Sequence, residues 1–425
     1  MRVQDPLDPP VPSDPPEPAA PGGPGEAVGP AGPVNPVGTV DPVDVDRDVP
    51  AAVEAWLRET LERRVREASA TDAVFGTDLA ARVARFAVTG GSRLRAELLW
   101  WAARGCGGGE SGAARLLGAA AAMELIQTCA LIHDDVMDGS ALRRGRAALH
   151  VVLDGQYGTG ARQLPCGTFG GAAAVLAGDL ALAWADDAFV ECLDGSGASG
   201  GAYAIWRAMR TEMVAGQYLD LRAQATGTGS AGQAARVAAL KTASYTVERP
   251  LALGATLAGA PERTVRRLRE AGRSAGLAFQ LRDDLRGTFG DPAVIGKPVG
   301  EDLREGRATY VLAVARERCA RAGDEAGLRL LDGAAGPAGA GGRAVDRVLD
   351  LLVACGARDE VARRVGELCH RGAEAVREAG LAPAAEDRIV TLLRGACGPD
   401  GGASDSGSPQ AVRKAGRPVS TGGGR

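Results

Sequence analysis

Residues 113–138 have the sequence AARLLGAAAAMELIQTCALIHDDVMD, and this stretch decides the fold class of the chain. It is rich in Ala and Leu and contains no Pro, a composition that favours one long helix. Glu124 and Gln127 interrupt its most apolar part, so we expect no membrane span and no stable insertion into a membrane. The stretch ends on the acidic run DDVMD, residues 134–138.

Outward from this stretch, apolar residues recur at helical spacing along most of the chain. The first such pattern follows Pro50, with Trp56, Leu57 and Leu61 on one side of the expected helix. Aromatic residues make up only 4% of the chain, which disfavours a sheet-rich core. We therefore expect an all-α, single-domain bundle of about ten or more helices. Further helical patterns cover residues 80–103, 113–138, 171–193, 202–223, 234–258, 262–289, 308–330, 343–355, 358–379 and 384–396.

The two ends of the chain have a different composition. Residues 1–48 contain 13 of the 24 prolines and most of the excess acidic charge, and residues 398–425 are rich in Gly and Ser. Neither composition can bury a core. We expect a disordered, Pro-rich acidic tail at 1–48, a folded domain at 49–397 and a second disordered tail at 398–425.

Composition also excludes several classes of protein. The formal net charge is −4, whereas proteins that bind nucleic acid carry a basic excess. The eight Cys and three His do not have the spacing of a zinc site, and the N-terminus has no signal-peptide pattern. We expect a cytoplasmic protein with reduced thiols that binds no nucleic acid.

The acidic run at the end of the long helix brings three carboxylates together. At 3.6 residues per turn, Asp134 and Asp138 stack on one face, and Asp135 lies about 100° round the helix. These carboxylates repel each other unless a cation lies among them, and hard oxygen ligands with room for water suit Mg²⁺ and a diphosphate. The alternative is a solvated acidic helix end, because a DDxxD motif alone is a weak signal.

A second acidic pair ends another apolar helical stretch. Asp283 and Asp284 follow Gln280, and Asp283 is 149 residues after Asp134. Buried carboxylates without a partner are costly, so two such clusters fit one cavity with metal ions between facing helices. A location on the solvated surface is again the alternative.

Cationic residues accompany the acidic motifs. Arg143 and Arg144 follow the first motif, Arg95 follows a Gly-Gly pair, and Lys241 and Lys297 are the only lysines before the C-terminal tail. Arg is the preferred bidentate phosphate ligand. Simple ion pairing with the nearby carboxylates would explain the same pattern.

Together these segments resemble the trans-isoprenyl diphosphate synthases, the polyprenyl synthetase family. The resemblance is strong from about residue 80 to residue 310, loose to about 396, and absent from both tails. It implies an isoprenoid-synthase fold with helices around a deep central cavity, prenyl transfer as the activity, and a homodimer. The segments that carry it are GGSRLRA (90–96), ELIQTCALIHDDVMDGSALRRGR (124–146), AGDLALAWAD (177–186), EMVAGQYLDL (212–221), KTASY (241–245) and FQLRDDLRGTFGDPAVIGKPVGEDLREGRAT (279–309).

The resemblance also implies roles for individual residues. Three Mg²⁺ ions would hold an allylic diphosphate, with Asp134, Asp138 and Asp283 as ligands and Asp135 and Asp284 nearby. Cleavage of the carbon–oxygen bond would give an allylic cation, which the double bond of isopentenyl diphosphate attacks. The diphosphate and the cation would contact Arg143, Lys241, Thr242 and Lys297; isopentenyl diphosphate would contact Arg95, Gln127 and Arg144; Gln217 and Gln280 would order the metal cluster and the cation pocket; and Arg307 would replace a late lysine.

The sequence departs from the family pattern at two informative positions. Ser92 replaces the lysine that contacts isopentenyl diphosphate, and Gly287 replaces the third aspartate of the second motif. Ser92 therefore keeps two alternatives open, a weakly active or regulatory subunit and a transferase with an unusual acceptor. A class I terpene cyclase would share the first motif, but its second metal motif should be of an Asn/Ser/Glu type rather than Asp-Asp.

Product length can be argued from the long helix itself. Ala130 lies one turn, about 5.4 Å, below Asp134 on the same side, beside Cys129. Short-chain members of the family have a bulky aromatic residue near here, so these small residues favour a product longer than fifteen carbons. We expect geranylgeranyl diphosphate, with twenty carbons. A longer-chain synthase is the alternative, because Met123, Leu125 or a residue from another helix could form the floor.

Overall fold

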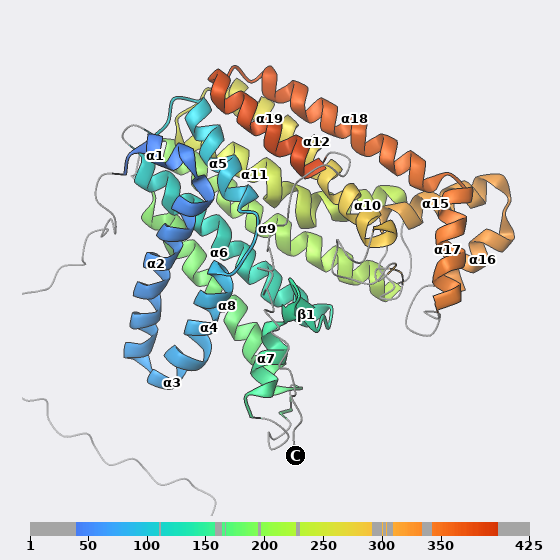
Figure 1. Ribbon diagram of the computed structural model, residues 1–425, viewed down its shortest axis with the longest axis horizontal. Coiled ribbons are helices and arrows are strands. Elements are labelled where there is room, and N and C mark those ends of the chain that lie inside the picture. The colour runs from blue at the N-terminus through green and yellow to red at the C-terminus, as the bar shows by residue number, and fades with distance from the viewer. Residues whose placement is uncertain are drawn as a thin grey trace, which may run out of the picture. The chain divides into compact units, whose positions relative to one another are not determined.

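The computed structural model describes residues 40–109, 112–157, 164–165, 167–193, 197–226, 230–290, 300, 303, 309–333 and 342–397. Helices dominate this part of the chain, which confirms the all-α prediction (Figure 1). The strands named within these residues are β1 (Leu142–Arg143) and β2 (Arg146–Ala147), which pair antiparallel around a tight turn.

Helix α6 (Ala113–Met137) is the central helix of the core. Every described residue from Leu116 to Ile126 is buried, and most of them are Ala or Leu. Helix α8 (Phe169–Glu191) packs along α6 in the opposite direction, because His133 contacts the carbonyl of Val175 while Gly118 adjoins Cys192. Helix α6 is long and apolar enough to cross a membrane, but 78% of its most apolar window is buried inside the protein.

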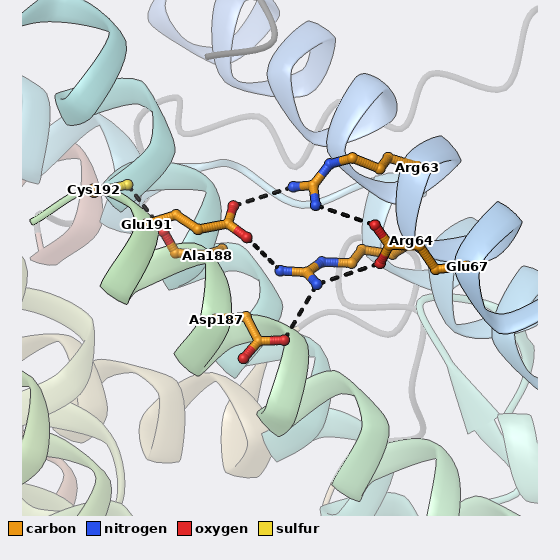
Figure 2. Close-up of polar contacts among 7 residues, drawn as sticks. All are labelled: Arg63, Arg64, Glu67, Asp187, Ala188, Glu191 and Cys192. Atoms are coloured by element: carbon orange, nitrogen blue, oxygen red, sulfur yellow. Dashed lines mark hydrogen bonds and ion pairs between the residues drawn. The ribbon is translucent and has the colours of Figure 1, made fainter. Parts of the chain in front are cut away.

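Helix α2 (Val49–Thr71) is tied to the far end of α8 by a polar network, shown in Figure 2. Arg64 Nη2 donates to Glu191 Oε1 at 2.8 Å, and Arg63 Nη2 donates to Glu191 Oε2 at 3.1 Å. Arg64 also pairs with Asp187 at 3.3 Å. These side chains are partly exposed, so water screens each pair and the network orients α2 more than it stabilises the fold.

A second group of helices covers the other side of α5 (Leu94–Gly105). Helix α12 (Glu262–Phe289) packs along α18 (Ala357–Arg377), and its Arg282 donates to the carbonyls of Gly395 and Ala396 in α19 (Pro383–Cys397). The remaining elements are α1 (Pro42–Arg47), α3 (Ala73–Phe75), η1 (Gly76–Ala80), α4 (Ala81–Val88), α7 (Leu149–Gly155), α9 (Gly197–Thr226), α10 (Ala231–Ala238), η3 (Ala239–Glu248), α11 (Arg249–Leu257), α15 (Tyr310–Ala322), α16 (Glu325–Gly333) and α17 (Gly342–Ala354).

Two stretches with a predicted helical pattern are each divided into two helices. The predicted helix at 80–103 is α4 followed by α5, because Gly90, Gly91 and Arg93 all have positive φ, at 70°, 98° and 53°. The predicted helix at 308–330 is α15 followed by α16, because Gly323 caps α15 in the left-handed conformation. Periodicity alone did not reveal these breaks, since the apolar pattern resumes almost at once.

The N-terminal boundary of the folded body also differs from the prediction. Helix α1 lies within the segment assigned to the acidic tail, with Asp41 as its N-cap and Val45 buried. Asp46 accepts hydrogen bonds from Trp100 Nε1 at 2.8 Å and from Arg104 Nη2 at 2.7 Å. These contacts to α5 are long-range and invisible in local composition. The rest of both predicted tails, 1–39 and 398–425, lies outside the described residues.

Replacing Asp46 should therefore destabilise the whole domain. We expect Asp46→Ala to lower the free energy of unfolding by about 1–3 kcal/mol, because Trp100 and Arg104 lose a charged acceptor. Asp44→Ala is the matched control, since Asp44 is exposed and pairs only with Arg47 among the contacts described. Its effect should stay within about 0.5 kcal/mol. Chemical denaturation measures the free energy of unfolding of both variants. Equal effects of the two substitutions would mean that α1 does not contribute to the stability of the folded domain.

Candidate active site

Three elements bring charged side chains together at the C-terminal end of α6. The ammonium group of Lys241 in η3 lies 3.0 Å from Asp134 Oδ1 and donates a 2.6 Å hydrogen bond to Asp220 Oδ2 of α9. Asp134, Asp220 and Lys241 are each about four-fifths covered. One cation therefore bridges the first acidic motif of α6 and an aspartate of a second helix.

The local backbone explains how Lys241 reaches both carboxylates. Element η3 is a π-helix of ten residues between α10 and α11, and π turns are frequent at functional sites because they change the direction of side chains. Gly216 of α9 lies against this segment so closely that a Cβ atom there would overlap the backbone nitrogen of Lys241. The missing side chain allows the two helices to approach.

The charge of Lys241 is stabilised where it lies. Burial by itself lowers the pKa of an ammonium group, but Asp134, Asp220 and Asp138 more than reverse this effect and raise the pKa of Lys241 above its ordinary value. Lys241 therefore stays protonated at neutral pH. Its positive charge offsets the repulsion among the carboxylates.

Arg143 forms a second bridge to the same motif. It lies on β1, and its Nε donates to Asp135 Oδ1 at 2.8 Å, with a second, shorter hydrogen bond from Nη2 to the same oxygen. Arg143 Nη2 also lies 3.5 Å from Asp134 Oδ2. The Asp135 side chain is only 1% exposed, and burial raises the pKa of this carboxyl group while Arg143 opposes the rise. Asp135 thus holds an arginine from a side of α6 that lies about 100° round the helix from Asp134.

The other predicted phosphate ligands lie close to the Gly-Gly loop before α5: Arg144 is in the turn between β1 and β2, and Arg95 is in the first turn of α5. Arg144, with φ 52°, donates from Nη1 to the carbonyl of Thr89 at 2.7 Å, and its guanidinium would lie 3.0 Å from a Cβ at Gly91. Arg95 donates to Thr246 Oγ1 at 2.8 Å and stacks over Tyr245, with 4.5 Å between its Cζ and the ring centre. Ser92 is exposed in the same loop.

Four further predicted residues, Gln127, Ala130, Gln217 and Thr242, lie along or near the Asp134 face of α6, and Cys129 does not. Gln217 of α9 contacts the sulfur of Met137, with 3.8 Å between Nε2 and Sδ. Gln127 and Ala130 are partly exposed along the Asp134 face of α6, and Thr242 is partly exposed next to Lys241. Cys129 is instead buried on the side of α6 that faces α8, where its sulfur lies 3.7 Å from His133 Nδ1.

The second acidic motif is arranged differently from the first. Asp284 accepts hydrogen bonds from Gln280 Nε2 at 2.9 Å and from the backbone nitrogen of Tyr310 at 3.1 Å, whereas Asp283 is exposed. Arg282, directly before Asp283, anchors α12 to α19. The predicted ligands Lys297 and Arg307 lie outside the described residues.

The donor set fits Mg²⁺ that is shared with a substrate. Among the residues that the structure describes, no group of three or more His, Cys, Asp or Glu side chains forms a ready-made metal site. Mg²⁺ is usually bound by one or two carboxylates, several waters and substrate phosphates rather than by an all-protein cage. Asp134 and Asp138 on one face of α6, with the Lys241 ammonium already held among carboxylates, provide the hard oxygen donors that such binding needs.

Asp220 is the site residue that the sequence predictions missed. It lies three residues after Gln217 in the segment EMVAGQYLDL, which places it on nearly the same helical face. That spacing was the available signal. Its partner Lys241 is 21 residues away, so only the packing of α9 against η3 reveals the pair.

Comparison with known proteins agrees with this helical fold. The model of the polyprenyl synthetase family matches residues 77–333. The chain belongs to the polyprenyl synthetase family. It is a prenyltransferase of the kind that elongates trans-prenyl chains.

The relatives carry the names of three different products. The chain is 33% identical over 235 residues to geranylfarnesyl diphosphate synthase of Aeropyrum pernix, a match that covers 55% of this chain and 68% of that protein. It is 36% identical over 230 residues to geranylgeranyl diphosphate synthase of Mycobacterium tuberculosis, covering 53% and 58%. It is 33% identical over 219 residues to farnesyl diphosphate synthase of Mycobacterium bovis, covering 52% and 55%. The last two matches span little more than half of those proteins.

Solved structures share the fold over most of the chain. Geranylgeranyl pyrophosphate synthase of Corynebacterium glutamicum, in complex with isoprenyl diphosphate and magnesium, aligns with a TM-score of 0.75 and 32% identity, covering 81% of this chain and 98% of that one. Geranylgeranyl pyrophosphate synthetase of Pyrococcus horikoshii aligns with a TM-score of 0.69 at 23% identity, covering 84% and 98%. The second likeness concerns the fold alone.

The contact between Asp135 and Arg143 should matter for substrate binding. We expect Asp135→Asn to lower kcat/KM for the allylic diphosphate roughly ten- to a hundredfold, because Arg143 loses the charged partner that aims it at the site. Asp187→Asn, in the exposed network of Figure 2, is the control and should leave kcat/KM unchanged. An unchanged value for Asp135→Asn would mean that Arg143 does not depend on this carboxylate.

The close approach of α9 and η3 can be tested at Gly216. We expect Gly216→Ala to destabilise the protein by about 1–3 kcal/mol and to reduce kcat, because the new Cβ pushes η3 and Lys241 away from Asp134. Gly200→Ala on the same helix is the control, since a Cβ there meets open space. It should be neutral or stabilise the helix by up to about 1 kcal/mol. Thermal unfolding and steady-state kinetics measure both, and a fully active Gly216→Ala enzyme would contradict this account.

Proposed function

We propose that this prenyltransferase condenses isopentenyl diphosphate with allylic diphosphates and releases geranylgeranyl diphosphate, with twenty carbons. The observation that carries the proposal is the partly exposed Ala130, one turn below Asp134 on the side of α6 that carries the acidic site. A small side chain there leaves room for a prenyl tail longer than two units. The name of the Corynebacterium glutamicum structure, geranylgeranyl pyrophosphate synthase, supports the same product.

In this proposal, different charged residues bind the two substrates. Arg143 and Lys241 lie at Asp134 and stabilise the allylic diphosphate as it departs, while Arg95 of α5 and Arg144 of the turn between β1 and β2 bind the phosphates of isopentenyl diphosphate. When bound, Mg²⁺ would neutralise diphosphate charge beside Asp134 and Asp138, and Asp283 would complete the set from α12. Thr242 and Gln217 lie near the reacting carbons and orient them. The departing diphosphate accepts the proton that the new allylic product loses.

A homodimer in the cytoplasm belongs to the same proposal. Large apolar side chains are exposed on α8 and α9, among them Leu176 at 60%, Val214 at 64% and Tyr218 at 65% exposed. Apolar side chains of this size on neighbouring helices fit coverage by a second copy. Light scattering after size exclusion checks this, and a monomeric mass at micromolar concentration would refute it.

The product assay tests the main proposal. Purified protein is incubated with Mg²⁺, isopentenyl diphosphate and, separately, C5, C10 or C15 allylic diphosphate, and the alcohols are sized after phosphatase treatment. We expect a C20 product from every primer that is accepted. A product stopping at C15, or a ladder beyond C20, would refute the product assignment while keeping the family activity.

Ser92 is the position that separates ordinary from unusual acceptors. We expect Ser92→Lys to lower KM for isopentenyl diphosphate roughly tenfold, because it adds a cation next to Arg144 in the exposed loop. The KM for the allylic diphosphate should not change, which serves as the internal control. An unchanged KM for isopentenyl diphosphate would show that Ser92 does not weaken this site, and it would favour a different acceptor.

A further inference from the structure

One face of α9 runs from the active site to a contact with α8. Gln217, Met213, Arg210 and Trp206 follow one another at helical spacing on this face. Gln217 contacts Met137 at the end of α6, and at the other end Trp206 stacks on Phe189 of α8, with ring centres 4.3 Å apart and planes 5° from parallel. A line of side chains thus leads away from the charged site and stops at α8.

An ion pair between α8 and α9 lies next to the aromatic stack, on the side of the charged site. Asp186 of α8 forms an ion pair with Arg210 and accepts a 2.7 Å hydrogen bond from Trp206 Nε1. The Asp186 and Arg210 side chains are 34% and 25% exposed, whereas Trp206 and Phe189 are fully buried. The ion pair therefore keeps contact with accessible space, and the aromatic stack next to it is fully buried.

The distance of this ion pair from the charged site can be measured along two helices, α9 and α8. Arg210 is ten residues along α9 from Asp220, the partner of Lys241, which corresponds to about 15 Å. Asp186 is eleven residues along α8 from Val175, whose carbonyl contacts His133 next to Asp134, which corresponds to about 16 Å. Both helices place the ion pair at the same depth below the charged site.

On α6 the exposed side chains of this face end above the level of the ion pair. Gln127, Ala130 and Leu131 keep partial exposure on the side of Asp134, whereas Met123 and Ile126 are fully buried. The accessible part of α6 therefore ends at Gln127, about 10 Å from Asp134 and one turn short of the level of the ion pair. Nothing on α6 itself closes the space with a charged or aromatic side chain.

We propose that the Asp186–Arg210 ion pair, backed by Trp206, is the floor that sets the longest allylic diphosphate this enzyme can elongate. The inference rests on the proposed prenyl elongation. Each isoprene unit has four backbone bonds of about 1.5 Å and spans roughly 5 Å when extended. A C15 tail of about 15 Å reaches the ion pair, and a C20 tail of about 20 Å would have to displace it.

The floor acts through charge as much as through size. A hydrocarbon tail pressed against Asp186 and Arg210 would remove water from both groups without replacing its hydrogen bonds, which is unfavourable. Trp206 holds Asp186 in place, so the ion pair cannot easily turn aside. Because a primer must enter before it is extended, a depth that accepts C15 and rejects C20 yields a C20 product.

The first test measures binding and needs neither turnover nor a variant. Thermal shift titrations with Mg²⁺ compare C15 and C20 allylic diphosphates on the wild-type protein. We expect the C15 compound to bind at least roughly tenfold more tightly, since its tail leaves the ion pair hydrated. Equal affinities, or tighter binding of the C20 compound, would overturn the proposal whether or not the protein elongates prenyl chains.

The second test changes the floor and sizes the products. In D186L/R210L two apolar side chains replace the charged pair, and we expect elongation of C20 diphosphate and products of C25 and longer. Arg210→Met removes the charge from one side only and guards against a double variant that fails to fold. Arg207→Leu, at an exposed position three residues from Arg210, is the matched control and should keep the wild-type product.

The outcomes separate the floor from the proposed function. Active variants with an unchanged product length would overturn the floor and leave prenyl elongation intact. Wild-type protein that binds C15 over C20 diphosphate but elongates neither C10 nor C15 would support the floor and overturn the proposed reaction.

Discussion

Repulsion among carboxylates is the constraint on which the rest of this structure depends. Asp134 and Asp135 of α6 and Asp220 of α9 converge within the reach of two cations, Lys241 and Arg143. Negative charges this close and this well covered repel each other strongly unless cations lie among them. The bridge from Lys241 requires a π-helix and a glycine at the crossing of η3 and α9. Several features far apart in the sequence therefore serve one electrostatic balance.

The two acidic motifs serve different structural ends. In the first, one carboxylate is buried on an arginine, and the other two stack on the neighbouring face of the helix end, about 100° round from it at Asp134. In the second, Asp284 is engaged by Gln280 and by the backbone of Tyr310, which leaves Asp283 exposed. In each motif, one carboxylate is engaged in hydrogen bonds within the protein, and another is more accessible. The accessible carboxylates of the two motifs are suitable ligands for metal ions that are shared with a diphosphate.

Much of the fold and a good part of the site could be predicted from local pattern. The helices α6, α8, α9, α12 and α18 followed from apolar spacing, because a helix that buries one face must repeat every 3.6 residues. The breaks at Gly90–Gly91 and Gly323 and the early start at α1 did not, because they depend on positive φ or on contacts such as Asp46 with Arg104. Asp220 and its pairing with the predicted Lys241 were missed for the same reason, since no local rule links residues on different helices.

The amino-acid sequence by itself determined the helical class, the family and the residue types available for binding a diphosphate, because these depend on composition, periodicity and motifs along one chain. Only the tertiary structure decided how those residues are used. It placed Asp135 on Arg143 and joined Lys241 to Asp220, and it set Asp186 and Arg210 about 15 Å below the site. The physical reason is that charge pairing and depth depend on distances between helices, which are set by the packing of their faces and not by the order of residues.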